Sequence, residues 1–180
     1  MDQTEIWPSP GESDKEPDRI PRILKKLGLF SDPVSSRAFL IMSRFNLVPM
    51  KWRACTWKFI NASYRTADRN HTYQQICLRC KTPDTITHRL IQCPKAIFIS
   101  KCVFKFFNLS LRWSGSVVDQ IANLNSEETA ESISNRLAIS IILWVIHTSS
   151  LEELNSKTVM TDLEMVNRIR STIVDILFSY

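Results

Sequence analysis

Three cysteines and one histidine lie close together in the middle of the chain, at spacings typical of metal ligands. Two residues separate Cys77 from Cys80, and seven residues follow before His88. Four more residues precede Cys93. Three thiolates and one imidazole complete a tetrahedral zinc set and leave no position open for a reacting water. The pattern therefore predicts a structural Cys3His zinc knuckle held by these four residues.

The same cysteines could instead be ordinary buried residues or could form a disulfide. Three of the five cysteines and one of the three histidines fall within 17 residues, which favours a metal site. A disulfide is the weaker alternative, because no secretory signal precedes the segment. The longest apolar run, 137–146, is too short to cross a membrane. We therefore expect an intracellular protein, with nuclear and cytoplasmic locations both open.

The residues around the ligands predict the backbone that positions them. Asp84 or Thr85 can cap a short helix from which His88 projects. Pro94 disfavours helical geometry at Cys93 and can itself open the next helix as its first residue. We expect Cys93 at the corner between two helices, where its sulfur reaches the same ion as His88.

The rest of the chain has the periodicity of helices. Apolar residues recur at intervals of three and four in 50–63, 94–107, 117–124, from 125 or 126 to about 147, and in 161–177. No alternating strand of useful length is present, and three glycines are few for a β-rich protein. We predict an all-α fold of about six helices pinned by one zinc knuckle. Residues 1–19 are expected to be a disordered tail, and residues 20–180 a single helical domain.

Apolar stripes and caps define these helices further. Trp52, Cys55 and Phe59 predict a buried face, and Thr161 with Glu164 matches a capping box. The helix after Pro94 is expected to use Ile97, Phe98, Cys102, Val103, Phe106 and Phe107. The last helix is expected to use Leu163, Val166, Ile169, Ile173, Ile176 and Leu177.

The charge distribution points to a polyanionic partner. The whole chain carries a net charge of +5, but residues 51–113 hold twelve basic and two acidic residues, a net charge of +10. Residues 114–180 hold four basic and nine acidic residues, a net charge of −5. A positive surface around the zinc segment would suit nucleic acid. A solvated surface partly neutralised by the acidic half is the alternative.

The segment Cys77–Pro94 resembles the zinc-binding segment that follows the polymerase domain in non-LTR (LINE-like) retrotransposon reverse transcriptases. The Cys-x2-Cys pair, the Asp84-Thr85 pair and the His-x4-Cys-Pro ending match the pattern of that family. Tryptophans on both sides also fit it: Trp52, Trp57, Trp113 and Trp144. The resemblance is specific over 77–94 and loose over about 43–147.

The resemblance implies a nucleic-acid-binding module without polymerase or nuclease activity, because the paired aspartates that hold catalytic metal ions have no counterpart in this sequence. The cations that bracket the ligands are the candidates to contact phosphates: Arg79, Lys81, Arg89 and Lys95. Such contacts read no sequence, so binding of RNA or DNA is expected to be nonspecific. The alternative is a structural domain in which zinc serves folding alone and the acidic residues 114–180 bind a protein.

Overall fold

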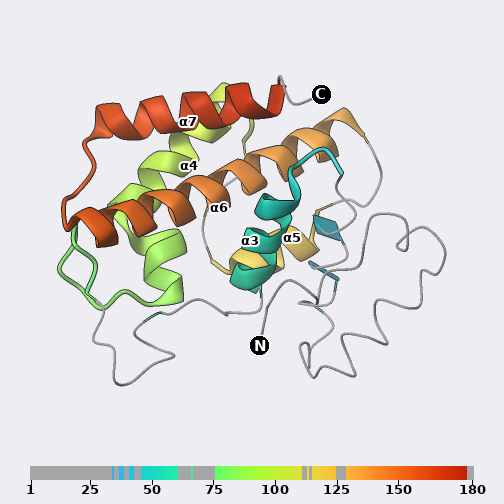
Figure 1. The fold of residues 1–180 in the computed structure, drawn as a ribbon. Coiled ribbons are helices and arrows are strands. Elements are labelled where there is room, and N and C mark those ends of the chain that lie inside the picture. The colour runs from blue at the N-terminus through green and yellow to red at the C-terminus, as the bar shows by residue number, and fades with distance from the viewer. Residues whose placement is uncertain are drawn as a thin grey trace.

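The computed structural model describes residues 46–60, 76–110, 115–124 and 129–177, together with Val34, Arg37, Ala38, Ile41, Met42, Thr66 and Trp113. Within these residues the chain forms six helices and no strand, which confirms the all-α prediction (Figure 1). They are α3 (Met50–Ile60), the π-helical turn η2 (His88–Gln92), α4 (Pro94–Phe106), α5 (Val117–Ala122), α6 (Ala130–Ser156) and α7 (Asp162–Leu177). The expected tail, 1–19, lies outside the described residues.

Helix α6 is the centre of the fold. It packs against α3, α4, α7 and the η2 turn, and Figure 1 shows it running between α3 and α7. Buried side chains cover most of its circumference: Ala138, Ile139, Ile141, Ile142, Leu143, Val145 and Ile146. By length and composition α6 could also cross a membrane, but 61% of its most apolar stretch is buried inside the protein. Burial on all sides is typical of a core helix.

The bounds of α6 differ from those expected from the sequence. The helix begins at Ala130, where Thr129 accepts a 3.1 Å hydrogen bond from the N–H of Ser132; residues 125–128 lie outside the described residues. It ends at Ser156, so the predicted end near residue 147 is wrong. Beyond residue 147, the polar residues Thr148 and Ser149 continue the helix and donate hydrogen bonds to carbonyl groups of its preceding turn. Thr148 Oγ1, for example, donates to the carbonyl oxygen of Trp144 over 3.0 Å.

Helix α3 buries the face that the sequence predicts. Trp52, Cys55 and Phe59 are all buried. Trp52 stacks on Trp144 of α6, with ring centroids 5.6 Å apart and planes inclined by 16°. The Cys55 thiol lies 3.8 Å from the carbonyl oxygen of Leu143, for which it is a weak donor. These contacts fix α3 across the middle of α6.

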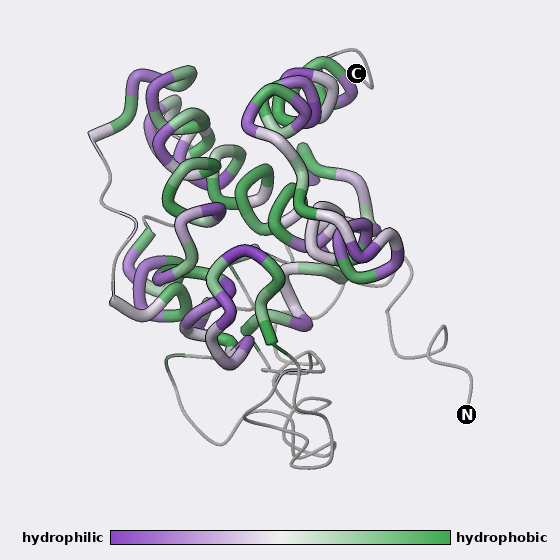
Figure 2. The backbone as a smooth tube through the Cα atoms, turned by 90° about the vertical axis from the view of Figure 1, so that its left-hand side faces the viewer, coloured by the Kyte–Doolittle hydropathy of each residue, from purple (hydrophilic) through white to green (hydrophobic). Residues whose placement is uncertain are grey.

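The outer helices bury a different stripe of residues from the one expected. Helix α4 buries Ala96, Ile99, Ser100, Val103 and Phe104, whereas Ile97 is 37% and Phe106 is 59% exposed. Helix α7 buries Met165, Ile169, Thr172, Ile173 and Ile176, but Leu163 is 70% exposed. Each helix has more apolar residues than one packed face can cover, so some point outward. Figure 2 shows the result, with hydrophobic positions gathered toward the middle of the bundle.

The start of α7 confirms the predicted capping box. The N–H of Thr161 donates to Glu164 Oε2 over 2.7 Å, and the N–H of Glu164 donates to Thr161 Oγ1 over 3.3 Å. Two backbone donors that have no partner inside the helix are thereby satisfied.

Truncating the core of α6 should destabilise the protein far more than truncating an outward residue of α7. Ile142 is fully buried, so Ile142→Ala is expected to lower the free energy of unfolding by about 2–5 kcal/mol. Leu163→Ala removes a side chain that is 70% exposed and should change it by less than about 0.5 kcal/mol. Urea denaturation measures both. Equal destabilisation by the two variants would contradict the central place of α6.

Candidate metal centre

The first half of the site is a tight backbone turn that carries Cys77 and Cys80. The N–H of Cys77 donates to the carbonyl oxygen of Thr82 over 2.9 Å, and the N–H of Lys81 donates to that of Cys77 over 2.8 Å. Lys81 adopts a left-handed φ of 59°, which reverses the chain direction. The backbone thus forms the knuckle that the two-residue spacing predicts.

The second half is a short helical segment that ends at Cys93. Thr85 Oγ1 accepts a 3.0 Å hydrogen bond from the N–H of His88, so Thr85 is the capping residue and Asp84 is not. The N–H of Cys93 bonds to the carbonyl oxygen of His88 over 2.7 Å, which closes the π-helical turn. Cys93 then becomes extended, with ψ of 130°, and Pro94 opens α4. This places Cys93 at the predicted corner.

The four candidate ligands converge on one point. Their ligand atoms all lie within 4.8 Å of one another. Cys93 Sγ is 3.9 Å from Cys77 Sγ and 3.7 Å from Cys80 Sγ. Sulfurs bound to one tetrahedral zinc at about 2.3 Å lie about 3.8 Å apart, so these separations suit the ion. The chain therefore contains a Cys3His group that could hold a metal such as zinc.

The His88 ring supplies a further indication of a metal. Its Nδ1 lies 3.4 Å from Thr82 Oγ1, whereas its Nε2 is buried and has no hydrogen-bond partner in the described residues. A buried nitrogen without a partner is costly. A metal-bound histidine usually donates its other ring N–H to an oxygen, and Thr82 is placed to accept that bond. The residues present therefore fit a zinc ion, with Nε2 as the ligand atom.

The three cysteine thiols of the cluster differ in the direction in which their pKa values are shifted. The hydrogen bond to Cys93 is the largest cause that lowers the pKa of Cys77 to about 3, and it outweighs the opposite effect of burial. The hydrogen bond to Cys77 and burial raise the pKa of Cys93, and burial raises that of Cys80. Zinc binds cysteine as the thiolate, so an ion at this site would release the protons of the thiols that it binds.

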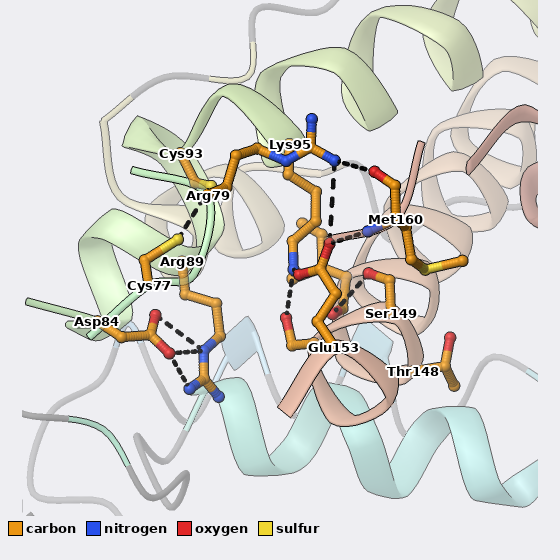
Figure 3. A network of polar contacts seen from close by, with 12 residues as sticks. Cys77, Arg79, Asp84, Arg89, Cys93, Lys95, Thr148, Ser149, Glu153 and Met160 are labelled. Carbon is orange, nitrogen blue, oxygen red and sulfur yellow. Dashed lines mark hydrogen bonds and ion pairs between the residues drawn. The ribbon is translucent and has the colours of Figure 1, made fainter. Parts of the chain in front are cut away.

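Buried charges link this site to the helices (Figure 3). Glu153 of α6 accepts a 2.6 Å hydrogen bond from Lys95 Nζ and a 3.1 Å bond from the N–H of Met160. Arg79 in the knuckle lies 3.9 Å from Glu153 and donates to the carbonyl oxygen of Met160 over 2.6 Å. The Glu153 carboxylate therefore connects the knuckle, α4, α6 and the segment leading into α7.

The four cations predicted to contact phosphates differ in burial and in the partners of their charges. Arg89 and Lys95 are both buried, and their charges are engaged by Asp84 and Glu153. Arg79 is half-buried and lies 3.5 Å from Asp162. These positions are unfavourable for phosphate contacts, because an ion pair removed from water is costly to separate. Of the four cations that the sequence predicts to contact phosphates, only Lys81 is exposed.

The sequence prediction does not include Glu153 as a buried residue, because it ends the helix near residue 147. If the helix is continued past residue 147, the buried positions Ile142 and Ile146 are followed by Ser149, Ser150 and Glu153 at helical spacing. That spacing carries Glu153 onto the buried face. An acidic residue on a buried face requires a cation, and Lys95 is that cation.

No protein-family model matches the chain, and no curated protein or solved structure matches it either. The resemblance to the zinc-binding segment of retrotransposon reverse transcriptases therefore stays a prediction from the motif residues. The structure itself supports a helical protein with a Cys3His group that could hold a metal.

Protein purified without added zinc should contain about one equivalent of zinc per chain. Cys80→Ser removes a ligand and is expected to abolish this content. Cys102→Ser is the matched control, because Cys102 lies on α4 outside the cluster and should leave the zinc in place. Elemental analysis measures all three proteins. Folded wild-type protein without zinc would contradict the site.

Neutralising Glu153 should destabilise the fold, because it leaves the buried Lys95 ammonium without its counter-ion. Glu153→Gln is expected to lower the free energy of unfolding by about 3–5 kcal/mol. The neighbouring Glu152 has a side chain that is 51% exposed and pairs with Arg168. Glu152→Gln should therefore cost no more than about 1 kcal/mol. Similarly small effects in both variants would exclude a central role for Glu153.

Proposed function

We propose that this protein is a zinc-stabilised helical module whose metal serves the fold and not catalysis, and that its partner is nucleic acid. The closed donor set carries the first part of the proposal. Catalytic zinc sites keep one position open for water or substrate, whereas Cys77, Cys80, His88 and Cys93 supply four protein ligands. The links from Arg79 and Lys95 to Glu153 also suit a structural role, since they join the site to the core.

The exposed charge supports nucleic acid as the partner. In the described part of residues 51–113, Asp84 is the only carboxylate, and it is buried against Arg89. The exposed cations of that part are lysines: Lys51, Lys81, Lys101 and Lys105. A surface with cations and without exposed carboxylates attracts a polyanion. In this proposal the exposed lysines contact phosphates, whereas Arg89 and Lys95 stabilise the scaffold.

Binding should therefore depend on the exposed lysines and on salt. Replacing Lys51, Lys81, Lys101 and Lys105 by alanine is expected to lower the affinity and to reduce the salt slope by up to about one unit for each phosphate contact that is removed. Lys157→Ala/Arg170→Ala is the control, because these exposed cations lie outside the basic half. Titration of labelled single- and double-stranded RNA and DNA at two salt concentrations measures the effect. Zinc content should be unchanged in both variants.

The competing function is a protein-interaction domain in which zinc serves folding alone. Its support is that Arg79, Arg89 and Lys95 form internal ion pairs, whereas Asp162 and Glu164 are exposed in the acidic half. This alternative expects weak nucleic-acid binding at any salt and no change on removing the lysines. Wild-type binding no stronger than that of an unrelated protein of similar charge would refute the nucleic-acid proposal and leave the zinc site untouched.

A further inference from the structure

A cation and an aromatic ring meet where α3 packs on α6. Lys51 Nζ lies 5.4 Å from the centroid of the Trp144 ring, and the His147 ring is centred 5.9 Å from Trp144. Lys51 is exposed, whereas Trp144 and His147 are half-buried. Trp144 is held in place from below by its stack on Trp52. We refer to Lys51, Lys58, Trp144 and His147 as the α3–α6 seam.

Lys58 belongs to the same seam. It lies seven residues after Lys51, which is about two turns of α3, or about 10.5 Å along the same side of the helix. Burial first, and then the charges of Lys58 and Arg89, lower the pKa of His147 to about 4. Lys58 is half-buried and lies on the same side of α3 as Lys51, which is placed over Trp144 of α6. The imidazole is neutral at neutral pH, so the two lysines supply the charge of the seam.

Among the described residues, no carboxylate pairs with the lysines of the seam. In the described part of the chain, neither Lys51 nor Lys58 forms an ion pair. Asp84 is buried against Arg89. On the next turns of α6, the carboxylates of Glu152 and Glu153 pair with Arg168 and Lys95. The lysines of the seam are therefore available to an anion.

We propose that the α3–α6 seam is the surface on which this protein holds single-stranded nucleic acid, with Lys51 and Lys58 on phosphates and Trp144 against a base. This inference rests on the proposed nucleic-acid function and locates it. Proteins that bind single strands combine cations along the backbone with aromatic rings on which bases stack. A lysine above an indole is weakly held at an exposed site, so Lys51 can move to a phosphate and leave the ring to an unpaired base.

The exposed lysines of α4 are less suitable for this role. Lys101 and Lys105 lie one turn apart on α4, and neither lies over an aromatic ring in the described part of the chain. The nearby ring of Phe106 packs against Phe107 at an interplanar angle of 76°. This pair of lysines therefore provides a charge-matched control.

The test compares two double variants of the zinc-loaded full chain, with a labelled oligo(dT) as probe at two salt concentrations. Lys51→Ala/Lys58→Ala is expected to weaken binding and to reduce the salt slope by about 1.4, the value for two phosphate contacts on a single strand. Lys101→Ala/Lys105→Ala removes the same charge and should have the smaller effect on both quantities. Zinc content and thermal unfolding show whether each variant is folded.

A second arm separates the base from the phosphate. Trp144→Leu should weaken binding of oligo(dT) by roughly 5- to 150-fold, because a base loses its stacking partner. The same variant should bind inorganic polyphosphate as tightly as wild type, since polyphosphate has no bases. If Trp144→Leu does not fold, the comparison of oligo(dT) with its duplex in the wild-type protein replaces it. The single strand should then bind more tightly.

The outcomes distinguish this inference from the function on which it rests. Wild-type protein that binds no nucleic acid would refute the proposed function. Wild-type protein that binds oligo(dT), but loses affinity equally or more in Lys101→Ala/Lys105→Ala, would keep the function and overturn the seam. Equal binding of single strand, duplex and polyphosphate would likewise overturn the seam as a single-strand site.

Discussion

The burial of Glu153 is the constraint on which the arrangement of this protein depends. A carboxylate removed from water must be met by charge and by hydrogen-bond donors. Here Lys95 of α4, Arg79 of the knuckle and the backbone N–H of Met160 meet it. Each of these groups comes from a different part of the chain. Satisfying one side chain of α6 therefore fixes where the knuckle, α4 and the start of α7 must lie.

The candidate metal centre joins residues that are close in the sequence, whereas the charge network around Glu153 joins residues that are far apart in it. A zinc ion would hold Cys77, Cys80, His88 and Cys93 together within one short segment. The ion alone would not place that segment on the bundle. Two cations place the segment on the bundle. Arg79 follows Cys77 by two residues, Lys95 follows Cys93 by two residues, and both side chains reach Glu153 in the core.

The sequence predicted the helices and the ligand cluster because both depend on local patterns. The spacing of the cysteines, the Pro94 corner and the Thr161 capping box all act over a few residues. It did not predict that Lys95 faces inward, since its partner Glu153 lies 58 residues further along the chain. Asp84, the partner of Arg89, lies only five residues before it, but spacing alone does not show that this pair is buried. The prediction that Leu163 is buried was also wrong, because α7 packs on the rest of the protein through a different stripe, which includes Met165.

The compactness of the ligand cluster has a consequence for the order of folding. All four ligands lie between residues 77 and 93, so closing them around an ion requires only a short loop and costs little chain entropy. Glu153 follows Cys93 by 60 residues, which a ribosome adds in roughly 3–12 s. If the cluster holds zinc, a nascent chain can bind the ion before its central helix exists. Zinc uptake by a ribosome-stalled chain that ends before α6 would reveal this order, and α6 would then fold onto a knuckle that is already formed.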